Sequence, residues 1–363
     1  MTIALVTNVL APYRVPLYSL LAERYGVEVL CFGANASYVP AWFADLDGQL
    51  ASAPFPARRI AGPREALRLG RRYDAAIAPV AGGAMLPATY FGMRRRGRPF
   101  VLWGSVWAHP RGAKGALAFP LVRHVYRHAD AVVTYGEHVR RYVTRYRGRS
   151  DDVVIAPQSV EADLFGRAIG ADEIAAWRAE AGLPEGPLVL YVGRLVPEKG
   201  IPELLAAWST LDARPTLVAI GDGPLAGEVA ETPGARLLGP LARERLPVAY
   251  AAADLLVLPS IPTPRFREPW GLVCNEALHQ GTPVVATTAV GAVAGGLVRD
   301  GETGLVVPPG DAHALAGAIA RLLADPALRT RLGASGRAAL AGHTYAAMAD
   351  AFGVALARAG ALG

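Results

Sequence analysis

Two glutamates, Glu268 and Glu276, stand eight positions apart and enclose the sequence Pro-Trp-Gly-Leu-Val. Glu268 follows an apolar run at 253–260 that is typical of a buried parallel strand, and Glu276 lies in a helical pattern over 272–278. A helix that begins at the carboxyl end of a parallel strand favours an anionic, phosphate-bearing ligand, because its first backbone N–H groups have no partner within the helix. Ionised carboxylates only accept hydrogen bonds, so the glutamates suit the hydroxyl groups of a sugar or a ribose. Each glutamate taken alone is explained as a solvated charge, and it is the spacing that indicates a site.

The loop that follows a second apolar run, 188–192, carries two cations. Its sequence is Gly-Arg-Leu-Val-Pro-Glu-Lys-Gly, which places Arg194 and Lys199 five positions apart after Gly193. At the carboxyl end of a strand these cations are placed to bind a diphosphate, the arginine bidentately and the lysine as a point charge. The alternative is a surface loop in which Glu198 and Lys199 form an ordinary charge pair.

A third loop, with the sequence Gly221-Asp222-Gly223-Pro224, follows the next expected strand. Its glycines permit a tight turn or a close approach of the backbone to a ligand, here a nucleobase. A plain turn is the simpler explanation for this loop taken alone.

Length and composition indicate a globular protein of two domains. The chain has 363 residues, 52% of them hydrophobic, and its 40 glycines and 29 prolines are typical of many short connections. Cys31 and Cys274 lie beside apolar runs, so we expect buried thiols in a reducing compartment. The sequence shows no Cys and His cluster for a metal and no run of about 18 apolar residues for a membrane span. Residues 1–6 predict a first strand rather than a signal peptide.

The charge is divided unevenly along the chain. Residues 1–150 hold 21 Lys and Arg against 8 Asp and Glu, a net charge of +13, whereas the remainder holds 16 against 23, a net charge of −7. The basic half predicts an anionic partner, which could be a phosphate-linked acceptor, a membrane surface or nucleic acid. A solvated positive face is the alternative.

Strands and helices alternate through both halves, which predicts parallel sheets covered on both faces. The expected strands are 3–7, 27–32, 75–80, 100–103, 131–134 and 153–155 in the first half, and 188–192, 216–220, 235–238, 255–258, 283–286 and 304–307 in the second. A basic amphipathic helix is expected at 65–72, and the segment 157–187 is expected to be a linker region.

The predicted fold class is α/β, with two Rossmann-like doubly wound domains that face each other across a cleft. The first domain comprises residues 1–165, and the second comprises residues 166–342. The last helical pattern, within 343–363, is expected to cross back onto the first domain.

Taken in this order, the motifs resemble the retaining nucleotide-sugar glycosyltransferases of family 4, which have the GT-B fold of two Rossmann-like domains. The resemblance rests on the loops and glutamates above, on Ala-Asp-Leu-Leu-Val-Leu-Pro-Ser at 253–260, on Gly-Thr-Pro-Val-Val-Ala at 281–286 and on the segment 300–311. It is specific from Leu188 to Asp311 and looser in the first half, where mainly the order of strands and helices matches.

The resemblance implies a role for each matching residue of the second half. Arg194 and Lys199 match the cations that hold the diphosphate of the donor. Glu268 matches the carboxylate near the transferred sugar, and Glu276 matches the one that binds the ribose. The backbone N–H groups of Trp270, Gly271 and Leu272 are implied to face the sugar and the phosphate, and Asp222, Gly223 and Pro224 lie in the region that binds the base. The family needs no metal, and the Asp-x-Asp pattern of the sequence, Asp45-Leu46-Asp47, lies in the first half, outside the motifs that carry the resemblance.

Three residues of the first half are weaker candidates. His109 follows the strand expected at 100–103, where the family often keeps a histidine near the reaction centre. Tyr13 and Arg14 lie in the loop 8–14, where many members carry a Gly-Gly pair instead, and they are candidates for contact with the acceptor or a phosphate. A packing role is the alternative for Tyr13 and Arg14, and an ordinary loop position is the alternative for His109.

The sequence thus predicts a retaining, metal-independent glycosyltransferase with no cofactor, which uses a nucleoside diphosphate sugar, by family analogy a UDP-sugar. Glu268, Arg194, Lys199 and His109 are its expected catalytic residues. A nucleotide-sugar epimerase on the same fold and an inactive nucleotide-sugar binding protein are the alternatives. A phosphorylase is disfavoured, because it would need a second lysine for pyridoxal phosphate and the chain has only Lys114 besides Lys199.

The expected partners are the donor and an acceptor, which is a glycan, a lipid-linked molecule or a small molecule. No aromatic and basic recognition motif supports nucleic acid as a partner. The expected location is the cytoplasm, with peripheral contact of the basic first domain at the inner membrane face as a further expectation.

Overall fold

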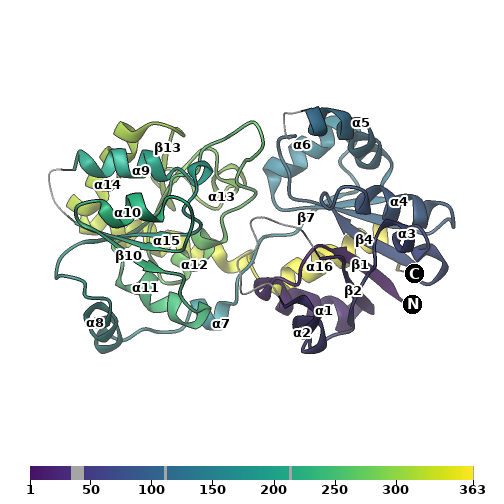
Figure 1. Cartoon of the computed structure of the whole chain (residues 1–363), viewed down its shortest axis with the longest axis horizontal. Coiled ribbons are helices and arrows are strands. Elements are labelled where there is room, and N and C mark those ends of the chain that lie inside the picture. Colours follow the sequence, from purple (N-terminus) through teal and green to yellow (C-terminus); the bar gives the residue numbers. More distant parts are fainter. Residues whose placement is uncertain (34–44, 110–112, 212–214, 363) are drawn as a thin grey trace. The chain divides into compact units, whose positions relative to one another are not determined.

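The computed structural model describes residues 1–33, 45–109, 113–211 and 215–362, and the chain divides into two compact units (Figure 1). Unit 1 comprises Met1–Gln158 and Tyr345–Gly363, and unit 2 comprises Ser159–Thr344. Residues 159–165, which we assigned to the first domain, therefore belong to unit 2. The reason is visible at Phe165, whose backbone carbonyl accepts a hydrogen bond from the side chain of Gln280 in the same unit.

Unit 1 is built on a seven-stranded parallel sheet with the order β3-β2-β1-β4-β5-β6-β7. Its strands are β1 (Ile3–Thr7), β2 (Val27–Cys31), β3 (Ala57–Arg59), β4 (Ala75–Pro79), β5 (Phe100–Gly104), β6 (Ala131–Thr134) and β7 (Val153–Ile155). Its helices are η1 (Pro12–Arg14), α1 (Val15–Tyr25), α2 (Leu46–Ala51), α3 (Pro63–Ala66), η3 (Leu69–Arg71), α4 (Met85–Arg94), α5 (Ala113–His128), α6 (Glu137–Arg147) and α16 (Tyr345–Arg358).

Unit 2 is built on a six-stranded parallel sheet with the order β10-β9-β8-β11-β12-β13. Its strands are β8 (Leu188–Val192), β9 (Thr216–Ile220), β10 (Ala235–Gly239), β11 (Leu255–Leu258), β12 (Val284–Thr287) and β13 (Gly304–Val307). Its helices are α7 (Ala162–Phe165), α8 (Ala171–Glu180), η4 (Pro197–Lys199), α9 (Ile201–Ser209), α10 (Ala226–Glu231), η5 (Arg243–Arg245), α11 (Leu246–Ala252), α12 (Leu272–His279), α13 (Gly291–Ala294), α14 (Ala312–Ala324), α15 (Pro326–Ala339) and η6 (Leu340–Gly342).

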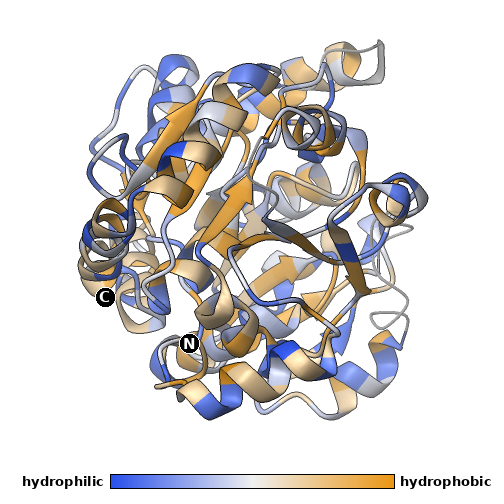
Figure 2. Ribbon diagram, turned by 90° about the vertical axis from the view of Figure 1, so that its left-hand side faces the viewer, coloured by the Kyte–Doolittle hydropathy of each residue, from blue (hydrophilic) through white to orange (hydrophobic). Residues whose placement is uncertain are grey.

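Strands β1, β5, β8 and β11 are buried along their whole length, as expected for parallel strands covered on both faces. In Figure 2 most strand arrows are orange, whereas the helices around them mix blue and orange along their length. Continuous apolar runs rather than alternating ones therefore specify the sheets. The two cysteines are free and buried, as predicted.

The strand order of unit 2 is that of a doubly wound Rossmann sheet, which confirms the predicted fold class. From β8 the chain moves outward to β9 and β10, and it then returns to β11 and moves outward in the other direction. The loops that follow β8 and β11 thus diverge at the point where the strand order reverses, and a crevice for a ligand forms there in such sheets.

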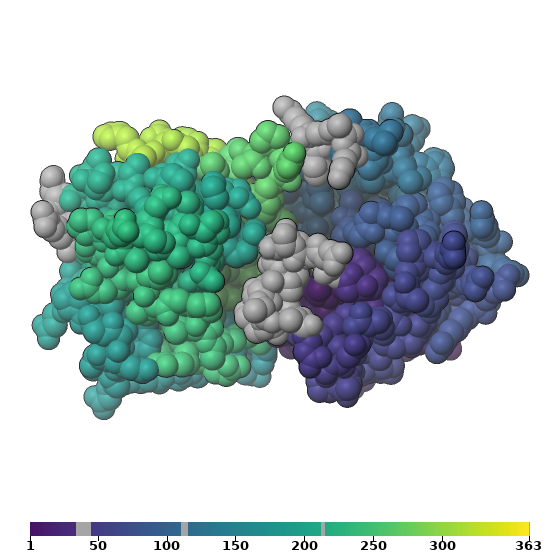
Figure 3. Space-filling view, viewed as in Figure 1, coloured from purple at the N-terminus to yellow at the C-terminus, as the bar shows by residue number. Residues whose placement is uncertain are grey.

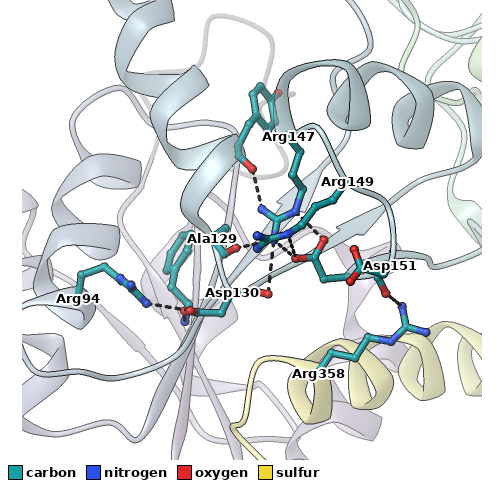
Figure 4. Close-up of polar contacts among 10 residues, drawn as sticks. Arg94, Ala129, Asp130, Arg147, Arg149, Asp151 and Arg358 are labelled. Atoms are coloured by element: carbon teal, nitrogen blue, oxygen red, sulfur yellow. Dashed lines mark hydrogen bonds and ion pairs between the residues drawn. The ribbon is translucent and has the colours of Figure 1, made fainter.

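The last helix, α16, belongs to unit 1, which confirms the predicted return of the chain. Its Phe352 is fully buried and meets the ring of Trp103 edge to face, with the ring centroids 5.0 Å apart. Near the end of α16, the guanidinium of Arg358 donates to the carbonyl of Asp151, beside the buried side chain of Arg147 (Figure 4).

Candidate active site

The loop between β8 and α9 is fixed by contacts of its backbone with the two neighbouring loops. Gly193 N–H donates to the carbonyl of Ile220 at 2.9 Å, and Ile261 N–H donates to the carbonyl of Glu198 at 3.1 Å. Gly200 has a φ of +74°, and a Cβ on it would lie only 2.0 Å from the carbonyl oxygen of Pro259. Glycine is required at this position because the loop touches the chain that leaves β11.

Lys199 and Glu268 form a buried ion pair at this junction. The Lys199 ammonium donates to Glu268 Oε2, and the two side chains are only 15% and 8% exposed. Ser260 Oγ donates to the same carboxylate oxygen at 3.2 Å, and the ammonium lies 5.5 Å from the ring centroid of Phe266. Removal of either partner would leave an uncompensated charge in a site that excludes water, so the two residues form one unit.

Arg194 lies in the same neighbourhood and is more accessible. Its side chain is 37% exposed, and its Nη2 lies 3.7 Å from Glu198 Oε1. The hydroxyl of the buried Tyr191 donates to the carbonyl of Arg194 at 2.7 Å. Burial raises the pKa of Tyr191; the charge of Glu268 adds to the rise, whereas that of Arg194 opposes it. Tyr191 is therefore within electrostatic reach of both residues.

Gly271 precedes the first residue of α12, and its φ of +91° and lack of a side chain let the chain pass Leu258 at the end of β11. Among the described residues, no side chain caps this end of α12, so the positive end of the helix is available to an anion. The side chain of Trp270 is 3% exposed, and its indole N–H donates to Asn275 Oδ1 at 2.8 Å. Trp270 thus fixes the start of the helix by packing, which leaves only its backbone for the predicted contact with a ligand.

Glu276, one turn into α12, accepts a hydrogen bond from the hydroxyl of the buried Tyr250 at 2.5 Å. Burial raises the pKa of Glu276, and the hydrogen bond from Tyr250 and the charge of Arg243 oppose the rise. Between the two glutamates lies Cys274, whose pKa is raised by burial and further by Glu268 and Glu276. The structure therefore brings the two glutamates and Lys199 around one short stretch of helix.

Comparison with known proteins identifies the domain that holds these residues. The family model described as "Glycosyl transferases group 1" matches residues 186–325, which include both loops, both glutamates and the start of α12. Residues 186–325 are a glycosyltransferase group 1 domain.

The relatives of the group 1 domain include an alpha-D-kanosaminyltransferase of Streptomyces kanamyceticus, 33% identical over 220 residues, which cover 58% of this chain and 55% of that protein. A GDP-mannose-dependent alpha-(1-6)-phosphatidylinositol monomannoside mannosyltransferase of Mycolicibacterium smegmatis is 29% identical over 362 residues, 92% of each chain. The chain spans about half the length of the first curated relatives it matches.

The crystal structure of Anabaena HepE in complex with UDP superposes with a TM-score of 0.81 at 19% identity, and the match covers 98% of this chain and 99% of that one. At this identity the likeness shows the fold, and it extends through both units.

The third predicted loop of the group 1 domain is a packed turn. Asp222 Oδ1 accepts a hydrogen bond from Gly223 N–H at 2.7 Å. A Cβ on Gly223, which has a φ of +157°, would lie 2.4 Å from the carbonyl of Leu195, and one on Gly221 would lie 1.9 Å from that of Gly193. Both glycines are required by the contact of this loop with the cationic loop. The role of Asp222, Gly223 and Pro224 toward a base stays a prediction.

The remaining predicted residues lie in unit 1, outside the group 1 domain. His109 Nε2 lies 2.8 Å from the carbonyl of Gly115. The side chain of Tyr13 is partly exposed, whereas Arg14 is buried, with its guanidinium 2.7 Å from Gln158 Oε1 and 5.0 Å from the ring centroid of Trp103. The guanidinium of Arg14 thus has partners inside its own unit. Roles of His109, Tyr13 and Arg14 in the reaction remain predictions.

Three residues of the group 1 domain were missed by the sequence interpretation: Tyr250, Ser260 and Arg243. Tyr250 and Ser260 hold the two glutamates, but each lies in an apolar pattern that indicates core. Arg243 lies within electrostatic reach of Glu276, and its Nη2 is buried without a hydrogen-bond partner among the described residues. In the sequence Arg243 begins an Arg-Glu-Arg triplet, and such a triplet by itself indicates only a charged surface.

Within the described ranges, no group of three or more His, Cys, Asp and Glu side chains is arranged to hold a metal ion. In the same part of the chain, no helix combines the length and the apolar character that a membrane span requires.

Proposed function

We propose that this chain is a retaining, metal-independent glycosyltransferase that moves a sugar from a nucleoside diphosphate sugar, by preference a UDP-sugar, to an acceptor hydroxyl. The observation that carries the proposal is the buried pair of Lys199 and Glu268 at the switch point of the sheet of unit 2, beside the uncapped start of α12.

The placement of the donor follows from its own chemistry. The anomeric carbon of the sugar is bonded to an oxygen of the distal phosphate, so the side chains for the sugar and for the diphosphate must be neighbours. Lys199 and Glu268 are in contact, and Arg194 lies in the same loop as Lys199. We assign the diphosphate to Arg194, Lys199 and the N-terminus of α12, the sugar hydroxyls to Glu268 and the ribose hydroxyls to Glu276.

In the proposed reaction the bond between the anomeric carbon and the distal phosphate oxygen breaks, and the acceptor oxygen bonds to that carbon from the same face. The proton of the acceptor hydroxyl passes to an oxygen of the departing diphosphate, so no protein base is needed. Arg194, Lys199 and the helix dipole stabilise the charge that develops on the diphosphate, as preorganised cations do. Alanine at either cation is expected to lower the transfer rate by about 10²–10³-fold.

The acceptor is assigned to unit 1, with Tyr13, Arg14 and His109 as the candidate contacts. A lipid-linked acceptor is favoured by the mannosyltransferase of Mycolicibacterium smegmatis, whose name specifies a phosphatidylinositol monomannoside. It would be reached by peripheral contact of the basic unit 1 with the inner membrane face, from a cytoplasmic location.

A thermal-shift screen with UDP, GDP and their sugars tests the donor class. The solved HepE structure contains UDP, whereas the mannosyltransferase is named for GDP-mannose, so both bases belong in the screen. Stabilisation by about 2.7 kcal/mol is expected at a ligand concentration 100-fold above Kd. Turnover of a donor without any acceptor would favour the epimerase, and binding without transfer across a panel of acceptors would favour an inactive binding protein.

A further inference from the structure

An open pocket of about 480 Å³ lies at the surface of unit 1 and is lined mainly by arginines. The five arginines that line it are Arg64, Arg68, Arg71, Arg95 and Arg96. They come from two segments, one around α3 and η3 and the other at the end of α4. In Figure 3 the surface that residues 1–158 contribute to unit 1 runs from purple to blue. Both arginine segments fall in the blue range of the colour bar, which gives the residue number.

The pocket exists because the two segments touch through their backbones. A Cβ on Gly92 of α4 would lie 2.5 Å from the carbonyl of Ala66, and one on Gly70 would lie 2.6 Å from the carbonyl of Gly92. The sequence predicted one amphipathic helix over 65–72, but the chain forms α3 and then the separate turn η3, with Gly70 in the contact. The close approach places arginines of both segments around one hollow.

Among the residues that the structure describes, neighbouring acids do not balance the charge of these arginines. Glu65, the one acid in the sequence from 63 to 71, is held by Arg58 at 2.7 Å and by the N–H of Ala61 at 2.8 Å. Arg94 is paired with Asp130 at 2.8 Å, outside the pocket lining. In the described part of the chain, none of the five pocket arginines forms an ion pair with a carboxylate.

The ordinary explanation for arginines at the end of α4 is that they complement the negative end of the helix dipole. That explanation also applies to Arg64 and Arg71, in the last turns of the short α3 and η3, but it does not account for Arg68 or for the approach of both segments to one hollow. The five arginines are exposed, so water screens the repulsion between their like charges, and an anion that entered the hollow would reduce this repulsion further.

The pocket is separate from the carboxyl edge of the sheet of unit 1, where doubly wound sheets bind their ligands. Helix α4 leaves that edge after β4 and runs back toward the start of β5, so its last residues lie at the amino edge. The arginines are therefore not part of a site of the Rossmann type, and the donor residues assigned above lie in the other unit.

We propose that this pocket is a second anion-binding site, for a ligand that carries several phosphate groups close together. Guanidinium groups bind phosphates bidentately, and arginines on two walls can hold two or more phosphates at once. The ligand is either a free polyphosphorylated molecule or the headgroup of an anionic lipid, and the two share this chemistry. The proposal does not depend on the transferase activity.

The test uses the full chain and titrates inorganic tripolyphosphate by calorimetry at low salt. The variant R68Q/R96Q removes one arginine from each wall, and its matched control R141Q/R145Q removes two exposed arginines of α6. The wild type and R141Q/R145Q are expected to bind tripolyphosphate alike, both at this pocket and at the diphosphate site assigned above. The variant R194A/K199A removes the diphosphate site and is expected to keep binding at the pocket. In the background of R194A/K199A, R68Q/R96Q is expected to bind tripolyphosphate at least about tenfold more weakly, whereas R141Q/R145Q is expected to leave this binding unchanged.

A parallel flotation assay compares phosphatidylcholine vesicles with and without phosphatidylglycerol, to separate a headgroup from a free ligand. If the protein binds the anionic vesicles, and R68Q/R96Q loses this binding while R141Q/R145Q keeps it, the result supports the pocket as the site and a lipid headgroup as its ligand. Equal loss in both double variants, loss only in R194A/K199A, or no binding of either probe would overturn the proposal.

Discussion

Glu268 and Lys199 are 69 positions apart in the sequence, yet they share one buried contact. The types and spacing of the residues predicted both as members of a donor site. Their direct contact could not be predicted, because no local pattern states which loops of a parallel sheet meet. Tyr250 was missed for a related reason, since a tyrosine in an apolar helical pattern indicates packing, and its hydrogen bond to Glu276 exists only in the folded chain.

Replacement of Glu276 by glutamine is expected to change the stability of the fold and the affinity for the donor in opposite directions. Burial raises the pKa of Glu276, so the folded protein holds this proton more tightly than the unfolded chain does. Ionisation therefore reduces the stability of the wild type as the pH rises from the ordinary carboxyl range through the pKa of the folded state. Glutamine can still accept the hydrogen bond from Tyr250 and has no such ionisation.

At neutral pH, Glu276→Gln is accordingly expected to be more stable than the wild type, by about 1.4 kcal/mol for each unit by which the pKa is raised. Its affinity for the donor is expected to fall, because a carboxylate binds ribose hydroxyls more strongly. Urea unfolding across the acidic to neutral range, followed by donor titration, measures both effects. A stability difference between the two proteins that did not change with pH would contradict the expectation.

At the scale of elements, the long apolar runs made the central strands predictable, and the exceptions have a physical reason. The edge strand β3 has the sequence Ala-Arg-Arg and no apolar run, so it was not expected. It pairs through its backbone with β2, and its Arg58 is held by Glu28 at 3.2 Å and by Glu65 at 2.7 Å. Charged residues are tolerated on an edge strand, and the pattern of hydrophobicity cannot reveal such a strand.

The junction between the loops after β8 and β11 is tested by Gly200→Ala. The new Cβ would meet the carbonyl of Pro259 and would impose a side chain on a residue with a φ of +74°. We expect a loss of about 1–3 kcal/mol in stability and a lower transfer rate, because Lys199 precedes this glycine.

The matched control is Gly317→Ala in α14, where a Cβ meets nothing within 4 Å. In the middle of a helix this change is expected to raise the stability by about 0.5–1 kcal/mol and to leave the rate unchanged. Equal effects of the two substitutions on stability and rate would show that the contact with Pro259 does not position the loop.

At the scale of the whole molecule, the sequence predicted two doubly wound domains and the return of the last helix to the first. Both follow from alternating strands and helices, which leave few arrangements for a chain of this length. The exact limits of the units did not follow, because residues 159–165 carry no signal that tells with which sheet they pack. The predicted cleft between the domains remains a prediction.

Phe352→Ala tests the assignment of α16 to unit 1. The side chain is fully buried against Trp103, so its loss is expected to destabilise unit 1 by about 3–5 kcal/mol. Val354→Ala, at a position 44% exposed on the same helix, is the control and should change stability by less than about 0.5 kcal/mol. Hydrogen exchange of the strands distinguishes the units. If Phe352→Ala accelerated exchange more in β8 and β11 of unit 2 than in β1 and β5 of unit 1, relative to the wild type, the assignment would be contradicted.

The most direct test of the central claim is a calorimetric titration of UDP, with GDP in parallel, into three proteins: the wild type, Lys199→Ala and the double variant Lys199→Ala/Glu268→Gln. The double variant removes the buried carboxylate that Lys199→Ala leaves without its partner, so it separates a loss of binding from a loss of folding. We predict that the wild type binds one of the two nucleotides and that both variants bind it at least about tenfold more weakly. A folded double variant that bound the nucleotide as tightly as the wild type would contradict the assignment of the diphosphate to Lys199.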